Sequence, residues 1–127
     1  MVDPIFQTDT YQLAQKLLDA SALRQEAIAS NFANAETPGY HRIDLSNDFA
    51  SHLKAAVESG APPAEWQSIQ PTLSEDTQAR AVRPDGNNVD MDSELLAMDK
   101  NSVEYNYLAN VVTQNLKDLK TAITGNA

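Results

Sequence analysis

The stretch Asn31-Phe32-Ala33-Asn34-Ala35-Glu36-Thr37-Pro38-Gly39-Tyr40 ends the first long helical pattern of the chain. Amide side chains such as those of Asn31 and Asn34 can satisfy the backbone groups that remain free at a helix end. Proline followed by glycine suits the two central positions of a type II turn, because proline presets its φ and glycine accepts a positive φ. The stretch therefore predicts a helix end followed by a tight turn at Thr37–Tyr40.

The residues before this stretch predict one long helix. Neither Pro nor Gly occurs between Thr8 and Asn34, and a mostly apolar column recurs at alternating spacings of three and four. The column consists of Tyr11, Ala14, Leu18, Ser21, Gln25, Ile28 and Phe32. Polar residues in such a column can set the register of a helix pair, and the neighbouring Leu13, Leu17 and Leu23 widen the apolar surface toward other faces.

The C-terminal part of the chain carries the strongest periodic pattern. A 3-4 alternation continues without a break through Leu95, Met98, Ser102, Tyr105, Ala109, Val112, Leu116, Leu119 and Ile123. Asp90 or Asp92 is suited to cap the start of this helix, and Gly125 stands where a glycine often ends one. The pattern predicts a long helix with a coiled-coil seam.

These two patterns predict a mainly α fold. A long amphipathic helix cannot cover its own apolar column, so the N- and C-terminal helices are expected to pair as a coiled coil, either antiparallel or parallel. We expect residues 1–40 to form the first helix with its turn, residues 41–89 a central variable segment, and residues 90–127 the last helix. The two ends together would form one helical domain.

The central segment has weaker signals. The residues from His41 to Ser46 suit an extended strand, and Ser46 suits the N-cap of a short helix that ends near Glu58. From residue 61 to 88 the large apolar residues are few, and prolines interrupt them. We expect this part to be irregular or a small β-hairpin and to contribute no core.

Composition excludes several classes of function. Nine basic against eighteen acidic residues give a net charge of −9, and no basic cluster is present for a nucleic acid or an anionic lipid surface. No apolar run approaches the roughly 20 residues of a membrane-spanning helix. The chain has no cysteine, which excludes disulfides and thiolate chemistry. Its first residues lack the pattern of a cleaved secretory signal. Nucleic acid and direct lipid insertion are therefore not expected.

The residues that carry chemistry form no recognisable site. His41 and His52 lack a third metal ligand at a suitable spacing, and the acidic residues from Asp85 to Glu94 do not follow the spacing of a calcium-binding loop. No nucleophile turn and no phosphate-binding glycine loop is present. We therefore expect no catalytic residues, no metal and no cofactor.

The segment from Ser30 to Tyr40 resembles the S-N-x-A-N-x-x-T-P-G-Y signature of bacterial flagellar axial proteins, which build the rod, the hook and the hook–filament junction. Every fixed position of the signature is present. The short chain and the run Gly86-Asn87-Asn88-Val89-Asp90-Met91-Asp92 before the last helix look like proximal rod proteins of the FlgB type. The resemblance covers both ends of the chain and leaves residues 61–84 unmatched.

This resemblance implies a structural subunit of the proximal rod in the flagellar basal body. It implies export from the cytoplasm through the flagellar type III apparatus without a cleaved signal, and assembly through the terminal helices. The implied partners are other rod proteins, the junction of the membrane ring and export gate, and other copies of the chain. Our hypothesis is that the subunit transmits torque and performs no catalysis. The FlgC-type rod protein and a helical export adaptor or binding module remain as alternatives.

The hypothesis assigns assembly and packing to two groups of residues. The first group lies in the first helix and its turn: Tyr11, Leu18, Ile28, Asn31, Phe32, Asn34, Thr37, Pro38, Gly39 and Tyr40. The second group lies on the C-terminal column: Leu95, Met98, Tyr105, Ala109, Val112, Leu116, Leu119 and Ile123.

Overall fold

The computed structural model describes residues 4–79 and 82–125, which form four helices and two short strands. In chain order the elements are α1 (Pro4–Ala33), β1 (Ile43–Leu45), α2 (Asn47–Glu58), α3 (Pro63–Gln67), β2 (Leu73–Glu75) and α4 (Met91–Thr124). The fold is mainly helical, as the sequence predicts, with one small sheet between the first and last helices.

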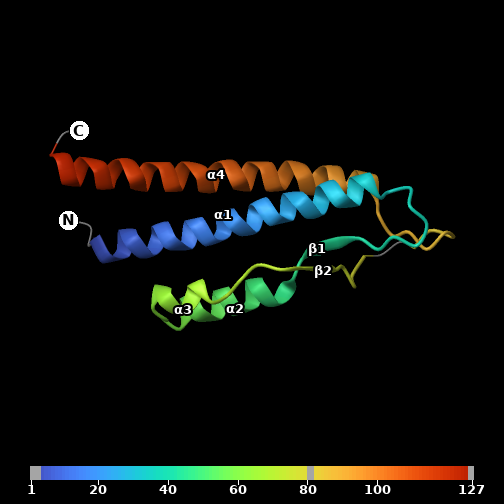
Figure 1. Ribbon diagram of the computed structural model, residues 1–127, viewed down its shortest axis with the longest axis horizontal. Coiled ribbons are helices and arrows are strands. Elements are labelled where there is room, and N and C mark those ends of the chain that lie inside the picture. The colour runs from blue at the N-terminus through green and yellow to red at the C-terminus, as the bar shows by residue number, and fades with distance from the viewer. Residues whose placement is uncertain (1–3, 80–81, 126–127) are drawn as a thin grey trace.

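The two long helices lie side by side and run antiparallel, so that both chain ends come to the same end of the molecule (Figure 1). Ser21 of α1 bonds to Asn101 of α4, whereas the later Asn31 bonds to the earlier Glu94. The C-terminal end of α4 projects past the beginning of α1 (Figure 1). The predicted pairing of the terminal helices is confirmed, and the antiparallel alternative is the observed one.

α1 is the central layer, with α4 on one side and the smaller elements on the other (Figure 1). The main apolar cluster lies on this second side and joins Ala20 of α1, Phe49 and Leu53 of α2, and Trp66 of α3. Around the cluster pack the half-buried Leu13, Leu17, Leu45, Ala56, Ala61 and Ile69. Of the leucines beside the predicted column of α1, Leu13 and Leu17 thus pack on this second side.

The expectation that residues 61–88 contribute no core is wrong for Trp66, which is 8% exposed in the cluster. Pro62 and Pro63 do not keep this segment irregular, because a proline is well tolerated in the first turn of a helix. The short helix α3 that follows carries the indole back onto α1. A single large aromatic side chain therefore anchors a segment with few other apolar residues.

β1 and β2 form a two-stranded antiparallel sheet in which Asp44 pairs with Ser74. β1 precedes α2 and β2 follows α3 in the chain, so the sheet joins the two ends of the segment that contains these helices. Ser46 follows β1 directly and caps α2 by accepting a hydrogen bond from the Asp48 backbone N–H. The predicted strand and the predicted cap are both confirmed.

The ends of α4 also follow the predicted signals. Asp90 accepts a hydrogen bond from the Asp92 backbone N–H at the start of the helix. Gly125 ends the helix with φ at +69°, and its N–H donates to the Thr121 carbonyl. Within residues 4–79 and 82–125, no helix has the length and apolarity required to span a membrane.

Candidate functional site

The end of α1 is joined to β1 by a single buried side chain. Asn31 is 0% exposed. Its Nδ2 donates to the Ile43 carbonyl at 2.8 Å, and its Oδ1 accepts from the Ile43 N–H at 3.0 Å. The amide thus pairs with both backbone groups of Ile43 as a neighbouring strand would. Tyr40 adds a hydrogen bond from its hydroxyl to the same Oδ1 at 3.1 Å.

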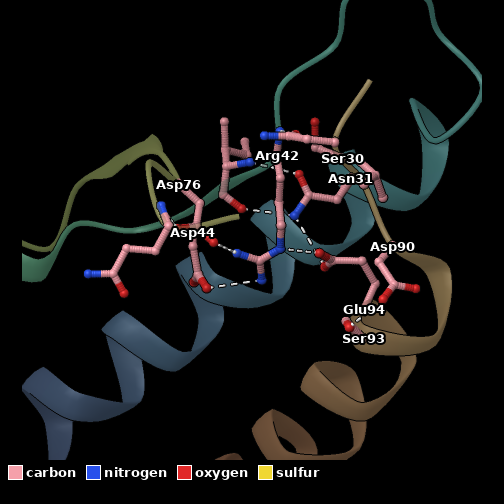
Figure 2. A network of polar contacts seen from close by, with 12 residues as sticks. Ser30, Asn31, Arg42, Asp44, Asp76, Asp90, Ser93 and Glu94 are labelled. Carbon is pink, nitrogen blue, oxygen red and sulfur yellow. Dashed lines mark hydrogen bonds and ion pairs between the residues drawn. The ribbon is translucent and has the colours of Figure 1, made fainter. Parts of the chain in front are cut away.

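Arg42 is the centre of a charged network between the two long helices (Figure 2). Its Nε donates to the carboxylate of Glu94, which is 0% exposed on the first turns of α4. The remaining guanidinium nitrogens reach Asp76 at 2.7 Å and Asp44 at 3.1 Å. Asn31 Nδ2 donates to the other oxygen of Glu94 at 3.2 Å, so every part of the buried carboxylate is paired.

The network changes the pKa values of two of its members. Burial alone would lower the pKa of Arg42, but the hydrogen bond and charge of Glu94, together with Asp44, raise it above its ordinary value. Burial alone would raise the pKa of Asp44, but a hydrogen bond from the Leu45 N–H and the contacts with Arg24 and Arg42 lower it. Both side chains are therefore held in their charged forms.

Two sequence motifs that lie far apart in the chain dock against each other beside this network. The amide of Asn87, which is fully buried, donates to the carbonyls of Asn34 and Thr37 at 2.9 Å each. The Gly39 N–H donates to the Asp85 carbonyl at 2.9 Å. A Cβ at Gly86 would stand 3.4 Å from the Gly39 Cα, so the two glycines allow this close approach.

The turn itself has the predicted form. The Tyr40 N–H donates to the Thr37 carbonyl at 3.2 Å, and Gly39 has φ at +74°, as the third position of a type II turn requires. Thr37, Pro38 and Gly39 are exposed and Tyr40 is half-buried. The side chain of Asn34 stays local, since its Nδ2 donates to the Ser30 carbonyl at 2.9 Å.

The face of α4 that meets α1 combines polar and apolar residues. It contains a heptad column of Glu94, Asn101, Leu108 and Asn115, of which the first three are buried. Asn101 accepts from the Ser21 hydroxyl and donates to the Ser21 carbonyl and to Gln25 Oε1, each at 3.0 Å. The centre of the helix pair is therefore held by hydrogen bonds as well as by apolar contact.

The predicted column of α4 is only partly turned toward α1. Its members Leu95, Ser102, Ala109 and Leu116 lie one residue further along in each heptad than the buried column. Met98, Ala109 and Val112 are half-buried beside α1. The other large apolar members are exposed: Tyr105 42%, Leu95 50%, Leu116 49%, Leu119 56% and Ile123 76%. A second apolar patch, formed by Leu96, Val103 and Tyr107, lies on the opposite flank with exposures of 55%, 71% and 67%.

The predicted residues of α1 are buried to different degrees. Ile28 is 1% exposed, and Tyr11, Leu18 and Phe32 are half-buried. A shallow groove of about 380 Å³ runs between the helices, where Ala22 and Gln25 of α1 meet Asn101, Ser102 and Tyr105 of α4. The structure thus buries or half-buries part of each predicted group within the helix pair and leaves the large C-terminal members of the second group exposed.

Sequence reasoning missed the residues that join the elements, namely Arg42, Glu94, Asn87 and Asn101. Each is a polar residue in a segment where solvation was the simpler interpretation. Three signals were present: Asn101 interrupts a long helical pattern, Arg42 directly follows the turn motif, and Asn87 lies within the glycine-asparagine run before α4. None of them indicates the partner in a distant element, because Arg42 and Glu94, Asn87 and Asn34, and Asn101 and Gln25 are each more than 50 residues apart along the chain.

The titratable side chains of the described residues form no arrangement typical of a catalytic or metal-binding site. Among residues 4–79 and 82–125, no three His, Asp or Glu side chains are grouped so as to hold a metal ion. His41 is exposed and lies 3.4 Å from Glu75 across the sheet, and His52 is exposed on α2. The polar network joins elements to one another and leaves its charges paired.

Comparison with known proteins shows which protein family this chain resembles. A family model described as "Flagella basal body rod protein" matches residues 14–41, which include the second half of α1 and the turn. The chain is 32% identical to the flagellar basal body rod protein FlgB of Escherichia coli (strain K12) over 124 residues, covering 86% of this chain and 88% of that protein.

Other relatives have the same name. The FlgB of Salmonella typhimurium is 34% identical over 126 residues, covering 87% of this chain and 90% of that protein. The FlgB of Proteus mirabilis (strain HI4320) is 30% identical over 130 residues, covering 91% and 93%. These relatives are rod proteins and not enzymes, in agreement with the prediction that the chain is not an enzyme. The chain therefore belongs to the flagellar basal body rod proteins of the FlgB type, and it is a structural subunit of that rod.

Proposed function

We propose that this rod subunit is held in the proximal rod by the outward faces of its helix pair and transmits torque through them. The observation that carries the proposal is the exposed apolar column of α4, in particular Leu95, Leu116 and Leu119, which are about half exposed. A helix that leaves such a column uncovered is typical of a subunit that packs against neighbours. Torque would then pass from one subunit to the next through packed helices.

The second patch of α4 supports neighbours on two sides. Leu96, Val103 and Tyr107 are more than half exposed on the flank opposite the column. A helix with apolar residues on nearly all sides is suited to the interior of a larger bundle. We infer that α4 is surrounded by other helices in the rod, whether these belong to other rod proteins or to further copies of this chain.

The turn at Thr37–Tyr40 is proposed as a second contact, at the end of the molecule away from the chain termini. Its first three residues are exposed, and the docked loop around Asn87 holds it in place. A turn that is rigid before contact loses little conformational entropy on binding. It would meet a neighbouring subunit or the junction of the membrane ring and export gate.

Export through the flagellar type III apparatus is part of the same proposal. It has its support in the resemblance to axial proteins. We expect the protein to be retained in the cytoplasm when the export gate is inactivated, and to fractionate with the basal body when the gate is intact. Retention in the basal body without the gate would contradict the export route.

The assembly surface is tested by Leu116→Asp, with Asn110→Asp as the matched control on an exposed position of the same helix. Because Leu116 is half exposed, the isolated variant should lose no more than about 1 kcal/mol of unfolding free energy. In a strain lacking the native gene, the Leu116→Asp variant should not support swimming, whereas Asn110→Asp should. Normal swimming by the Leu116→Asp strain would exclude this column as an assembly surface.

A further inference from the structure

The rotation of α4 about its own axis is not the one that hydrophobicity alone favours. The heptad column turned toward α1 consists of Glu94, Asn101, Leu108 and Asn115, of which only Leu108 is apolar. The next residue along in each heptad gives the column of Leu95, Ser102, Ala109 and Leu116, of which only Ser102 is polar. Successive residues of an α-helix differ by about 100° around its axis. A partial roll of α4 would therefore bury the apolar column against α1 and gain hydrophobic stabilisation.

The buried polar contacts of α4 oppose that roll. Asn101 is 3% exposed and forms three hydrogen bonds to α1, two to Ser21 and one to Gln25, each at 3.0 Å. A roll would break all three, of which the two to Ser21 are buried, and unpaired buried polar groups are costly. The contact also includes a backbone carbonyl, that of Ser21, which cannot rotate away as a side chain can.

Glu94 opposes the roll in a different way. Its main partner is Arg42, which belongs to the segment before β1 and not to either long helix. The contact with Arg42 therefore ties α4 to the central segment. Between the two long helices Glu94 accepts one hydrogen bond, from Asn31, whereas Asn101 takes part in three. Asn115, in the same column, donates to the Val111 carbonyl of its own helix.

We propose that Asn101 is a positioning residue that fixes the rotation of α4 on α1 and so keeps the apolar column of α4 turned outward. Replacing its amide with an apolar group removes these three hydrogen bonds, so that only the contacts of Glu94 near the start of α4 still oppose the roll. The helix would then turn its column onto α1 and withdraw it from the surface. The roll of α4 is inferred independently of the proposed function. The further statement that assembly needs this column on the surface rests on the proposed function.

The roll is measured by the reactivity of single cysteines, which the cysteine-free chain makes possible. Ser102 is exposed and belongs to the outward column, so the labelling rate of Ser102→Cys measures how accessible that column is to solvent. Val103 is 71% exposed on the other flank and stays on the surface in either rotation. The labelling rate of Val103→Cys therefore shows whether the variant loosens or unfolds α4 as a whole. Labelling rates with a thiol reagent are compared with and without Asn101→Leu in the full chain.

We expect Asn101→Leu to slow labelling at Ser102→Cys by about tenfold, as burial within a packed helix pair does, with no more than about a twofold change at Val103→Cys. Asn115→Leu is the matched control, since it removes an amide of the same column that bonds within α4, and it should leave both rates unchanged. Asn101→Ala removes the three hydrogen bonds without adding volume, and it should slow labelling at Ser102→Cys in the same direction.

Unchanged labelling at Ser102→Cys in both Asn101 variants would overturn the proposal. Faster labelling at both cysteines would also overturn it, because Asn101 would then only hold the helices together. Swimming separates this inference from the proposed function: slowed labelling with loss of swimming supports both. Slowed labelling with normal swimming would retain Asn101 as the positioning residue and overturn the use of the column in assembly.

Discussion

At the scale of single residues, the fold depends on polar side chains that bond across elements. Asn31 replaces a strand partner for Ile43, and Arg42 neutralises the buried Glu94. Such contacts contribute little net stability when intact, because burying charge is costly, but losing one partner leaves the other uncompensated. The network therefore acts mainly to specify how α1, β1 and α4 meet.

This argument predicts a large effect for Arg42→Met. Glu94 would remain 0% exposed without its cation, so the free energy of unfolding should fall by about 3–5 kcal/mol, measured by urea denaturation with circular dichroism. The double variant Arg42→Met with Glu94→Met should recover part of that loss, because it removes the unpaired buried carboxylate.

The exposed pair of Lys54 and Glu58, 3.9 Å apart on α2, provides the control. Lys54→Met should change the free energy of unfolding by less than about 1 kcal/mol, because solvent screens the pair. An Arg42→Met variant as stable as Lys54→Met would show that the network is not needed to hold the three elements together.

At the scale of elements, α1 is shared between two packing surfaces. One side meets α4 through Ser21 and Asn31, and the other side meets α2 and α3 through Ala20. The cluster around Ala20 depends on Trp66, because α3 has only five residues and one large apolar side chain. In the described part of the chain the indole N–H of Trp66 has no hydrogen-bond partner, so its contribution is one of packing.

We therefore predict that Trp66→Ala lowers the free energy of unfolding by about 3–5 kcal/mol, since it removes the largest side chain of a small core. Trp66→Phe should cost less than about 1.5 kcal/mol, because it keeps an aromatic ring and removes the unpaired N–H. Both are measured by urea denaturation with circular dichroism, since Trp66 is the only tryptophan of the chain. Equal losses for the two variants would contradict the packing role.

At the scale of the whole molecule, order is expected to decline from the network toward the chain ends. Around Glu94 and Asn101 α4 is held by buried contacts, whereas Leu116, Leu119 and Ile123 are exposed. The C-terminal end of α4 also projects past the beginning of α1 (Figure 1). An exposed helix end without tertiary contacts frays, because most helical stability in proteins comes from packing.

Hydrogen exchange of the isolated chain tests this gradient. Amides between Glu94 and Leu108 should exchange about a hundredfold more slowly than those after Leu116, because local opening requires less free energy where fewer buried contacts must break. Uniform protection along α4 would contradict the gradient. It would also indicate that the isolated chain covers its apolar column, for example in a stable oligomer, as a binding module would.

The sequence by itself determined the four features that depend on local chemistry. These are the two long helices, the cap at Ser46, the glycine turn after Pro38 and the end of α4 at Gly125. It also contained the motif that places the chain among flagellar rod proteins. Each of these depends on residues within a few positions of one another, where spacing and backbone preference are sufficient.

Only the tertiary structure decided which face of α4 meets α1, and which loops dock together. Hydrophobic periodicity favours the column of Leu95 and Leu116, yet the buried column is that of Glu94 and Asn101. The reason is that the free energy of a buried polar residue depends on its partner, and the partners here lie more than 50 residues away along the chain. No local pattern reveals such a partner, so the orientation of α4 depends on the folded chain as a whole.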